Sequence, residues 1–561
     1  MKMNRRKFNL LAASMVAASV SLGGREALGA LSPISAAELT LNRLTFGATP
    51  DSILVFEALG KSAWLDAQFS APIEDKDLHA RLAAARLPIE YEAGSDGDNP
   101  EKSWPARNEA LAYQYLQSSG ADLLRLVDFD TTFIDWEERI RPAREVQSAV
   151  FIRATHSNAQ LREVMTQFWH DHFNVNSQAH GMTAAYFAQY DTMLRRNALG
   201  NFRQMLGEMT KSPAMLFYLN NEASEASPAN ENFARELLEL HTLGAPHYVN
   251  GQYANWAEVP GARQGMATGF LDEDVYEVAR AFTGWTFGDG RYLQEGTNAP
   301  LSGEFLYVDS WHDPYQKRVL GHELPPNSGP MEDGEAVLDL LAVHPGTAKY
   351  VCEKICRRLL MDHPPQDLID MAAQVFLANS AAPDQISAVI RAIVMSDTFD
   401  ATPARKLKRP FEFLISIYRR AGAQLVSPKY DLAYQLAVTG WSQHEFRPPT
   451  GHSDLSEDWA NTSALNGMVL AATMGLEPEL IGSEMDFESL MGAQGQTWGS
   501  ALTFWFERFG GMDDPKETAT QLLAQHDIAP DAPLAADEEE TAWILRSVIG
   551  LGALTPKFMF R

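Results

Sequence analysis

The sequence predicts an all-α protein, built as a large multi-helix body with one small β-hairpin and long loops. Three observations predict this class. Apolar residues recur at helical spacing along most of the chain, a single segment has convincing strand character, and no repeat of about 20–50 residues indicates a solenoid. The chain has 561 residues, of which 45% are hydrophobic. That composition is sufficient for a sizeable buried core.

The length would allow about two to four domains, although a helical protein of this size can also form one continuous body. We expect a leader at residues 1–30, a main helical domain at 31–425 that carries the candidate site, and a C-terminal helical segment at 426–561 packed on it. The formal net charge of −27 argues against nucleic acid as a partner, because phosphate recognition needs a basic face. Basic residues cluster only at 354–358 and 405–409, and we interpret both clusters as helix faces or ends.

The first thirty residues predict export. Arg5 and Arg6 precede the uncharged, mostly apolar stretch 10–22, and the small residues of 27–30 follow it. This is the pattern of a signal peptide that the twin-arginine (Tat) translocase reads, so the mature protein is expected in the periplasm or secreted, with the translocase as its partner during export. An apolar run of about a dozen residues is short of the roughly 20 that span a bilayer, so no stable membrane anchor is expected after cleavage. Tat export also favours a bound cofactor, because that route carries folded proteins.

The helices expected before the centre of the chain lie at 35–69 with a break, 78–87, 104–124, 143–155, 161–175 and 201–219. In the fifth of these, His172 continues an apolar stripe at helical spacing. It is either a core histidine satisfied by a hydrogen bond or a ligand or acid–base group. His170 lies about 200° round the same helix and cannot face the same ion as His172 unless the helix ends there.

The stretch at 230–244 is predicted to be a central helix with apolar residues on two adjoining lines. Glu236 and Glu239 stand three residues apart on the remaining face. Two close buried carboxylates need a cation, or one of them must hold a proton. The cation could be Arg235, Arg280 or a metal ion.

Residues 245–269 follow without periodicity, and their length is typical of a lid or substrate-facing loop. A helix from 272 to 285 carries Asp274, which we interpret as part of a helix cap or an ion pair. Residues 305–308 and 317–320 are predicted to pair as the β-hairpin, with His312 on the loop between them.

Further helices are expected at 336–342, 347–360, 368–378, 382–395, 410–421, 432–440 and 541–551. Cys352 and Cys356 lie one helical turn apart in the second of these. A disulfide between them would close almost no loop, so we expect two thiols packed in the core.

The assembled motifs resemble a large family of secreted bacterial proteins known only as domain of unknown function 1800. The resemblance rests on LNRLTFGAT, FWHDHFNV, NENFARELLELHTLG, DVYEVARAFTGWTF, WHDPYQKRVLG, HPGTAKYVCEKICRRL, KRPFEFLIS and the terminal LTPKFMFR, in this order along almost the whole chain after the leader. It implies an exported, mostly helical protein, often encoded beside a secreted protein with a phosphatase- or sulfatase-like fold. The chain departs from the family's pattern at Gly451-His452, where Gly-Trp is more usual, and in the long insertion 251–269.

Three functions remain open from the sequence. The first is a metal-dependent hydrolase or oxidoreductase that holds iron, manganese or zinc, because helix pairs can present Glu-x-x-Glu and histidine inward. Its expected ligands are Glu236, Glu239 and His172, with His170, His241 and His312 in reserve, and Asn232, Arg235 and Asp274 as orienting groups. The second is a metal-free partner of a co-secreted phosphatase- or sulfatase-like protein, in which a buried ion-pair network fixes the packing. That network would contain Glu231, Arg235, Glu236, Glu239, Asp274 and Arg280.

The third is a glycan-active enzyme that uses two of these acids as general acid and base.

Overall fold

The computed structural model describes residues 34–95, 97, 100–293, 296–510, 513–525, 527–535 and 538–561. The predicted leader at 1–30 lies outside the described residues. Within them, helices dominate and the strands are short, so the mainly α prediction is confirmed. None of the described helices combines the length and the apolar character that crossing a membrane requires.

Local sequence explains where many helices begin. Thr49 starts α3 with a capping box, in which its side chain accepts a hydrogen bond from the backbone N–H of Ser52 and Pro50 occupies the first turn. Side chains of Ser35, Asp75 and Ser119 cap other helices in the same way. The helices up to the central stretch are α2 (Ala36–Leu44), α3 (Pro50–Leu59), α4 (Lys61–Ser70), α5 (Lys76–Ala84), α6 (Gly120–Val127), α7 (Trp136–Arg139), α8 (Arg141–His156), α9 (Gln160–His172), α10 (Gly181–Asn197), α11 (Phe202–Lys211) and α12 (Pro213–Tyr218).

The central stretch is not one regular α-helix. Helix α13 (Glu231–Glu236) continues as a π-helix over Leu237–His241. The side-chain hydroxyl of Thr242, the residue after it, donates to the carbonyl of Leu237 at 2.6 Å. The extra residue per turn changes which side chains face inward, and His241 is completely buried. Gly244 ends the segment with φ +93°, a value that glycine adopts without strain.

The remaining helices follow in two groups. Those of the middle of the chain are α14 (Asp272–Ala281), α15 (Glu332–Ala342), α16 (Pro345–Leu359), α17 (Gln366–Ala378), α18 (Gln385–Val394), α19 (Asp397–Ala401) and α20 (Pro410–Ala421). Those of the C-terminal part are α21 (Tyr430–Ala437), α22 (Ser456–Trp459), α23 (Thr462–Met474), α24 (Pro478–Ile481), α25 (Phe487–Met491), α26 (Trp498–Phe509), α27 (Pro515–Ala524), α28 (Glu539–Ala553) and α29 (Pro556–Met559).

The described strands form four antiparallel pairs instead of one hairpin. They are β1 (Arg86–Tyr91) with β4 (Arg107–Ala112), β2 (Gly94–Ser95) with β3 (Ser103–Trp104), β5 (Trp285–Phe287) with β6 (Phe305–Tyr307), and β7 (Lys317–Val319) with β8 (His322–Leu324). The predicted pairing of 305–308 with 317–320 is therefore wrong, since each segment pairs with a different neighbour. The predicted helix at 104–124 is also wrong at its start, because pairing with β1 overrides the helical propensity of β4.

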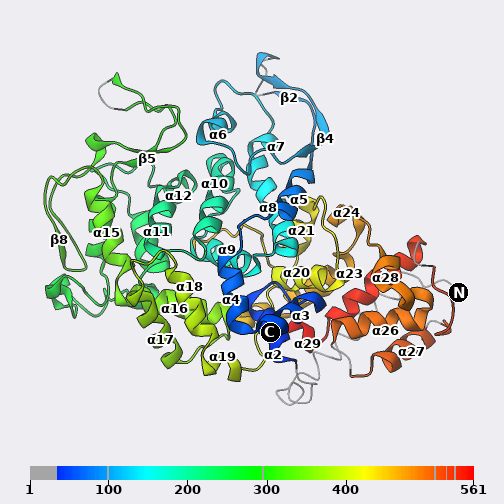
Figure 1. Cartoon of the computed structure of the whole chain (residues 1–561). Helices are drawn as coiled ribbons and strands as arrows, with labels where there is room; N and C mark the ends of the chain where they lie inside the picture. The colour runs from blue at the N-terminus through cyan, green and yellow to red at the C-terminus, as the bar shows by residue number, and fades with distance from the viewer. Residues whose placement is uncertain are drawn as a thin grey trace.

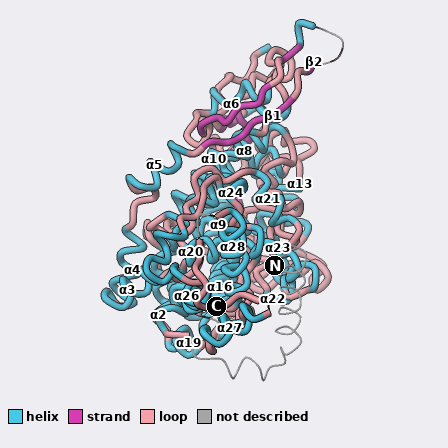
Figure 2. Tube along the Cα trace, turned by 90° about the vertical axis from the view of Figure 1, so that its right-hand side faces the viewer, coloured by secondary structure: helices cyan, strands magenta, loops and turns pink. Residues whose placement is uncertain are grey.

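The strand pairs occupy the periphery and the helices form the centre. Figure 1 shows β5 and β8 on one side of the body and α26, α27 and α28 on the opposite side. Figure 2 shows β1 and β2 at one end of it. Helix α20 packs against α8 of the N-terminal half and against α23, α26 and α28, so one contiguous core extends from Ala37 to Phe558.

Candidate functional site

A cleft of about 410 Å³ lies beside the C-terminal end of α9. Helices α9 and α16 line it together with Arg409, the residue that precedes α20, and the segment 446–458 completes it; Figure 1 shows α9 and α20 near the middle of the body. Its volume falls in the range typical of small-molecule sites. The cleft is lined by Phe168, Asp171, His172, Lys354, Arg357, Arg409, Phe446, Thr450, Gly451, His452, Ser453, Asp454, Leu455 and Asp458.

A lysine and a histidine meet on the wall of the cleft. The Nζ of Lys354 lies 2.9 Å from Nδ1 of His172, while Nε2 of the same ring lies 3.1 Å from the carbonyl oxygen of His241. Because a carbonyl oxygen only accepts, Nε2 carries the proton and Nδ1 accepts from the ammonium. Burial, followed by the charge of Lys354, holds the pKa of His172 well below its usual range, so this ring is neutral at pH 7.

Lys354 has no acidic partner among the residues that the structure describes. No carboxylate of these residues lies within 4.0 Å of its ammonium, and His172 occupies one of its three N–H bonds. The ring of Tyr350, on the same helix, lies 5.3 Å away. Burial lowers the pKa of Lys354 to about 8, while Asp171 and Asp454 oppose the shift. The ammonium therefore keeps its charge at pH 7 and has two donors to spare at the cleft.

Behind this wall lies a buried set of ion pairs that we call the ion network. It consists of Arg358, Lys406, Arg409 and Arg561 with Asp171, Asp362, Glu412 and Asp454. Glu412 is its centre, because it binds Arg358, Arg409 at 2.8 Å and Arg561 at 3.1 Å. The network holds as many cations as carboxylates, so its charges compensate one another.

Arg409 connects the ion network to the cleft. Its Nε donates to Glu412 at 2.8 Å and its Nη1 to Asp171 at 2.8 Å, and its guanidinium lies 4.9 Å from the ring centre of Trp441. The remaining nitrogen, Nη2, is buried and has no hydrogen-bond partner among the described residues. It is a second unused donor at this site.

The segment 446–458 is held against α9 by close contacts. Gly451 has φ +68°, and a Cβ at this position would lie 2.0 Å from the carbonyl oxygen of Asp171, so any side chain would push the segment away. The adjacent backbone N–H of His452 donates to the Asp171 carboxylate at 3.3 Å. The ring of His452 stacks on Trp441 at 4.2 Å.

Residues 39–560 match the sequence profile of a family described as "Protein of unknown function (DUF1800)". The chain belongs to the DUF1800 family. The match covers nearly all of the sequence, so the family resemblance inferred from the motifs is confirmed. Comparison with curated proteins found no match, and comparison with solved structures found none.

The acid pair of this DUF1800 protein lies at the end of α13 and in the π-helix. Glu236 and Glu239 are both half-buried, and no lysine or arginine of the described residues lies within 4.0 Å of either. Burial, and then the charge of Glu239, raises the pKa of Glu236. Arg235, the nearest cation along the chain, faces Glu231 at 3.7 Å and Asp272 at 3.4 Å instead. A raised pKa favours the protonated form of Glu236, which is one of the two ways to stabilise such a pair.

Of the three other candidate histidines, His241 lies beside His172, with ring centres 6.4 Å apart, whereas His170 and His312 have other surroundings. His170 points away from His172, as its angle on the helix predicts, and its Nε2 lies 3.0 Å from Asp191. His241 is buried, and neither ring nitrogen has a partner among the described residues. Burial, followed by the charge of Lys354, lowers the pKa of His241 to about 3.

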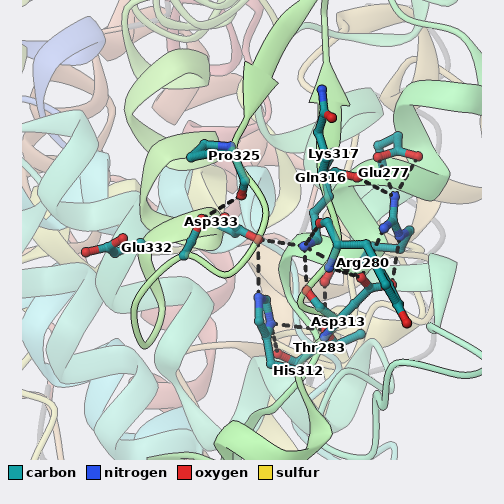
Figure 3. Close-up of polar contacts among 12 residues, drawn as sticks. Glu277, Arg280, Thr283, His312, Asp313, Gln316, Lys317, Pro325, Glu332 and Asp333 are labelled. Carbon is teal, nitrogen blue, oxygen red and sulfur yellow. Dashed lines mark hydrogen bonds and ion pairs between the residues drawn. The ribbon is translucent and has the colours of Figure 1, made fainter.

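His312 belongs to a separate polar cluster, drawn in Figure 3. Its Nε2 lies 3.2 Å from Asp333 and its Nδ1 lies 3.1 Å from the carbonyl of Thr283. Lys317 donates to Asp333 and to the carbonyl of Asp313, both at 2.6 Å. Burial alone would raise the pKa of Asp333. The hydrogen bonds from His312 and Lys317 outweigh it and lower this pKa to about 2. The partners of His312 and Lys317 are internal, so this cluster holds the loop onto α14 and α15.

Asp274 caps helix α14, as the sequence indicates. Its carboxylate accepts hydrogen bonds from the backbone N–H groups of Leu271 at 2.9 Å and Leu320 at 2.7 Å. Arg280 forms its own pairs with Glu277 and Asp313, both at 2.8 Å. The six residues proposed for one buried ion-pair network therefore do not form one, since Asp274 binds backbone and the two arginines bind different acids.

The structure does not gather the predicted metal ligands. Over the described ranges, no three side chains of His, Cys, Asp or Glu lie close enough to hold a metal ion together. His172, Glu236 and Glu239 thus do not share one centre, and a bound iron, manganese or zinc ion stays a prediction from the sequence. The residues that do converge are Lys354, Arg409, Asp171 and Asp454, none of which the helical patterns marked as functional.

Proposed function

We propose that this DUF1800 protein is exported and binds a small anionic ligand in the cleft beside α9. One observation carries the proposal: the ammonium of Lys354 lines the cleft without a carboxylate within 4.0 Å among the described residues. A desolvated cation is costly unless it is paired. An anion from solution is the partner that would compensate it.

The neighbouring groups support the same function. Nη2 of Arg409 is a second buried donor, without a hydrogen-bond partner in the described part of the chain. Arg357 also lines the cleft, but its charge is paired with Glu353. The ion network fixes Arg409 through Glu412 and Asp171, so the guanidinium does not reorganise when a ligand arrives. A preorganised cation loses less entropy on binding an anion.

Isothermal titration calorimetry with acetate, sulfate and inorganic phosphate tests the proposal. We expect at least one of these ions to bind the wild-type protein and to bind Lys354→Met at least about tenfold more weakly, because a hydrogen bond to a charged group contributes about 1.5–3 kcal/mol. The matched control is Lys349→Met, since Lys349 lies on the same helix but is 55% exposed and paired with Asp370. Equal anion binding by wild type and Lys354→Met, or binding by neither, would contradict the proposal.

Export is tested separately by cell fractionation. Replacing both Arg5 and Arg6 with lysine keeps the positive charge of the leader but removes the pair that the Tat translocase reads. We expect the full-length variant to stay in the cytoplasm while the wild-type chain reaches the periplasm or the medium. A variant exported as well as the wild type would count against the Tat route.

A further inference from the structure

We infer that the ligand of the cleft is an organic anion with a single negative charge carried on a ring-shaped body. This inference rests on the proposed function and adds the chemical class of the ligand to it. Two features of the lining carry it: the charge balance around Lys354 and the rings that face the anion-binding groups.

The charge balance points to one negative charge. The cations and carboxylates of the ion network compensate one another, and Arg357 is paired with Glu353 on its own helix. Asp458 lies at the exposed rim, where water solvates it. Lys354 is then the one cation of the described cleft wall that lacks an acidic partner. A ligand with one negative charge would neutralise it, whereas a dianion would leave an uncompensated buried charge.

Four uncharged rings lie in the lining of the cleft, beside the aliphatic side chain of Leu455. Phe168 and His172 lie nearly parallel, with an interplanar angle of 15° and ring centres 6.0 Å apart, and Phe446 and His452 lie with their ring centres 4.4 Å apart. Burial lowers the pKa of both histidines, so they present neutral rings. Flat ring faces are suited to contact an aromatic ring or the apolar face of a sugar ring.

Phe446 is the ring that tests this assignment most directly. It is half-buried and belongs to the segment that closes the cleft, where Asn174 donates to its carbonyl at 2.9 Å. Because this backbone contact does not depend on the side chain, Phe446→Ala should remove a ring surface and leave the segment in place. Phe504 is half-buried on α26, outside the cleft lining, and Phe504→Ala is the matched control.

The experiment compares five probes by isothermal titration calorimetry on the full chain. Acetate supplies the charge without a ring, benzamide the ring without the charge, and phenyl phosphate the ring with a second charge. Benzoate and glucuronate combine one charge with a ring and distinguish an aromatic body from a sugar. We expect the better of these two to bind at least about tenfold more tightly than acetate or benzamide, and phenyl phosphate to bind no more tightly. Phe446→Ala should weaken that ligand without changing acetate binding, and Phe504→Ala should change neither.

The outcomes separate this inference from the proposed function. If acetate binds as tightly as both benzoate and glucuronate, the ligand does not need a ring. If phenyl phosphate binds more tightly than these two acids, the ligand is not limited to a single negative charge. In both cases the cleft would still be an anion site. If none of the anions binds, or if uncharged benzamide binds as tightly as the better of the two ring acids, the anion-binding function itself fails.

Discussion

Glu412 should be the most sensitive acidic position of the ion network. It lies in the first turn of α20 and is buried among three guanidinium groups. Its Oε1 accepts from Arg358 and Arg409, and its Oε2 lies 3.1 Å from Nε of Arg561. Glu412→Gln keeps the size of the side chain but removes the charge, so the surrounding cations would exceed the remaining carboxylates.

The magnitude follows from burial. Removing one partner from a buried ion pair destabilises a protein by about 3–5 kcal/mol, because it leaves a charge without compensation. An unfolding entropy of about 2.1 cal/mol/K per residue over 561 residues gives about 1.2 kcal/mol/K for the chain. The substitution should therefore lower the melting temperature by about 3–4 °C.

Urea-induced unfolding followed by tryptophan fluorescence measures the change in free energy. The control is Asp66→Asn, because Asp66 also pairs with an arginine, Arg391, but its side chain is 64% exposed. Exposed ion pairs contribute little, so the control should stay within error of the wild type. If Glu412→Gln were as stable as the control, compensation within the ion network would not be what stabilises this part of the core, and the charge balance assigned to the cleft would fail with it.

Three further predictions concern groups outside the cleft. Burial raises the pKa of Asp274 from 3.8 to about 6, so the folded protein binds more protons than the unfolded chain between about pH 4 and 6. The contribution of Asp274 to the free energy of unfolding therefore falls as the pH rises through that range. In Asp274→Asn, the free energy of unfolding measured with urea should no longer fall over this pH range. Lys317→Met leaves Asp333 without its 2.6 Å partner and should destabilise the protein by about 3–5 kcal/mol, seen as faster hydrogen exchange in 312–335. Cys352 and Cys356 are free thiols, and their burial raises the pKa of both. A thiol reagent should therefore label neither cysteine in the native protein and both after denaturation.

The long periodic helices could be predicted from the sequence. Residues 347–360, 368–378 and 410–421 correspond closely to α16, α17 and α20, because each carries a continuous apolar face that only a helix can bury at once. The strand pairs could not be predicted in the same way. The sequence predicts strands around 305 and 317, but their partners are β5 and β8, because the choice of partner depends on contacts elsewhere in the fold.

The candidate site shows the same division. Residues 354–358 and 405–409 are the two basic runs of an acidic chain, and the sequence alone indicates no more than helix faces or ends for them. Their importance arises because Arg409 lies 2.8 Å from Asp171 and 3.5 Å from Asp454, which come from other parts of the chain. Lys354 meets His172 and no acid among the described residues. Gly451 and His452, where the chain departs from the family's pattern, both line the cleft. The sequence alone does not show that this local difference lies at the candidate site.

The sequence by itself determined the helical class, the family and the presence of thiols instead of a disulfide, because these follow from local periodicity, spacing and ordered motifs. Only the tertiary structure decided which charges are compensated. Glu236 and Glu239 have no cation beside them and Lys354 has no acid beside it in the described part of the chain, whereas Glu412 has three cations. Electrostatic compensation is set by distances of a few ångströms between residues far apart in sequence, and neither helical angle nor composition specifies those distances.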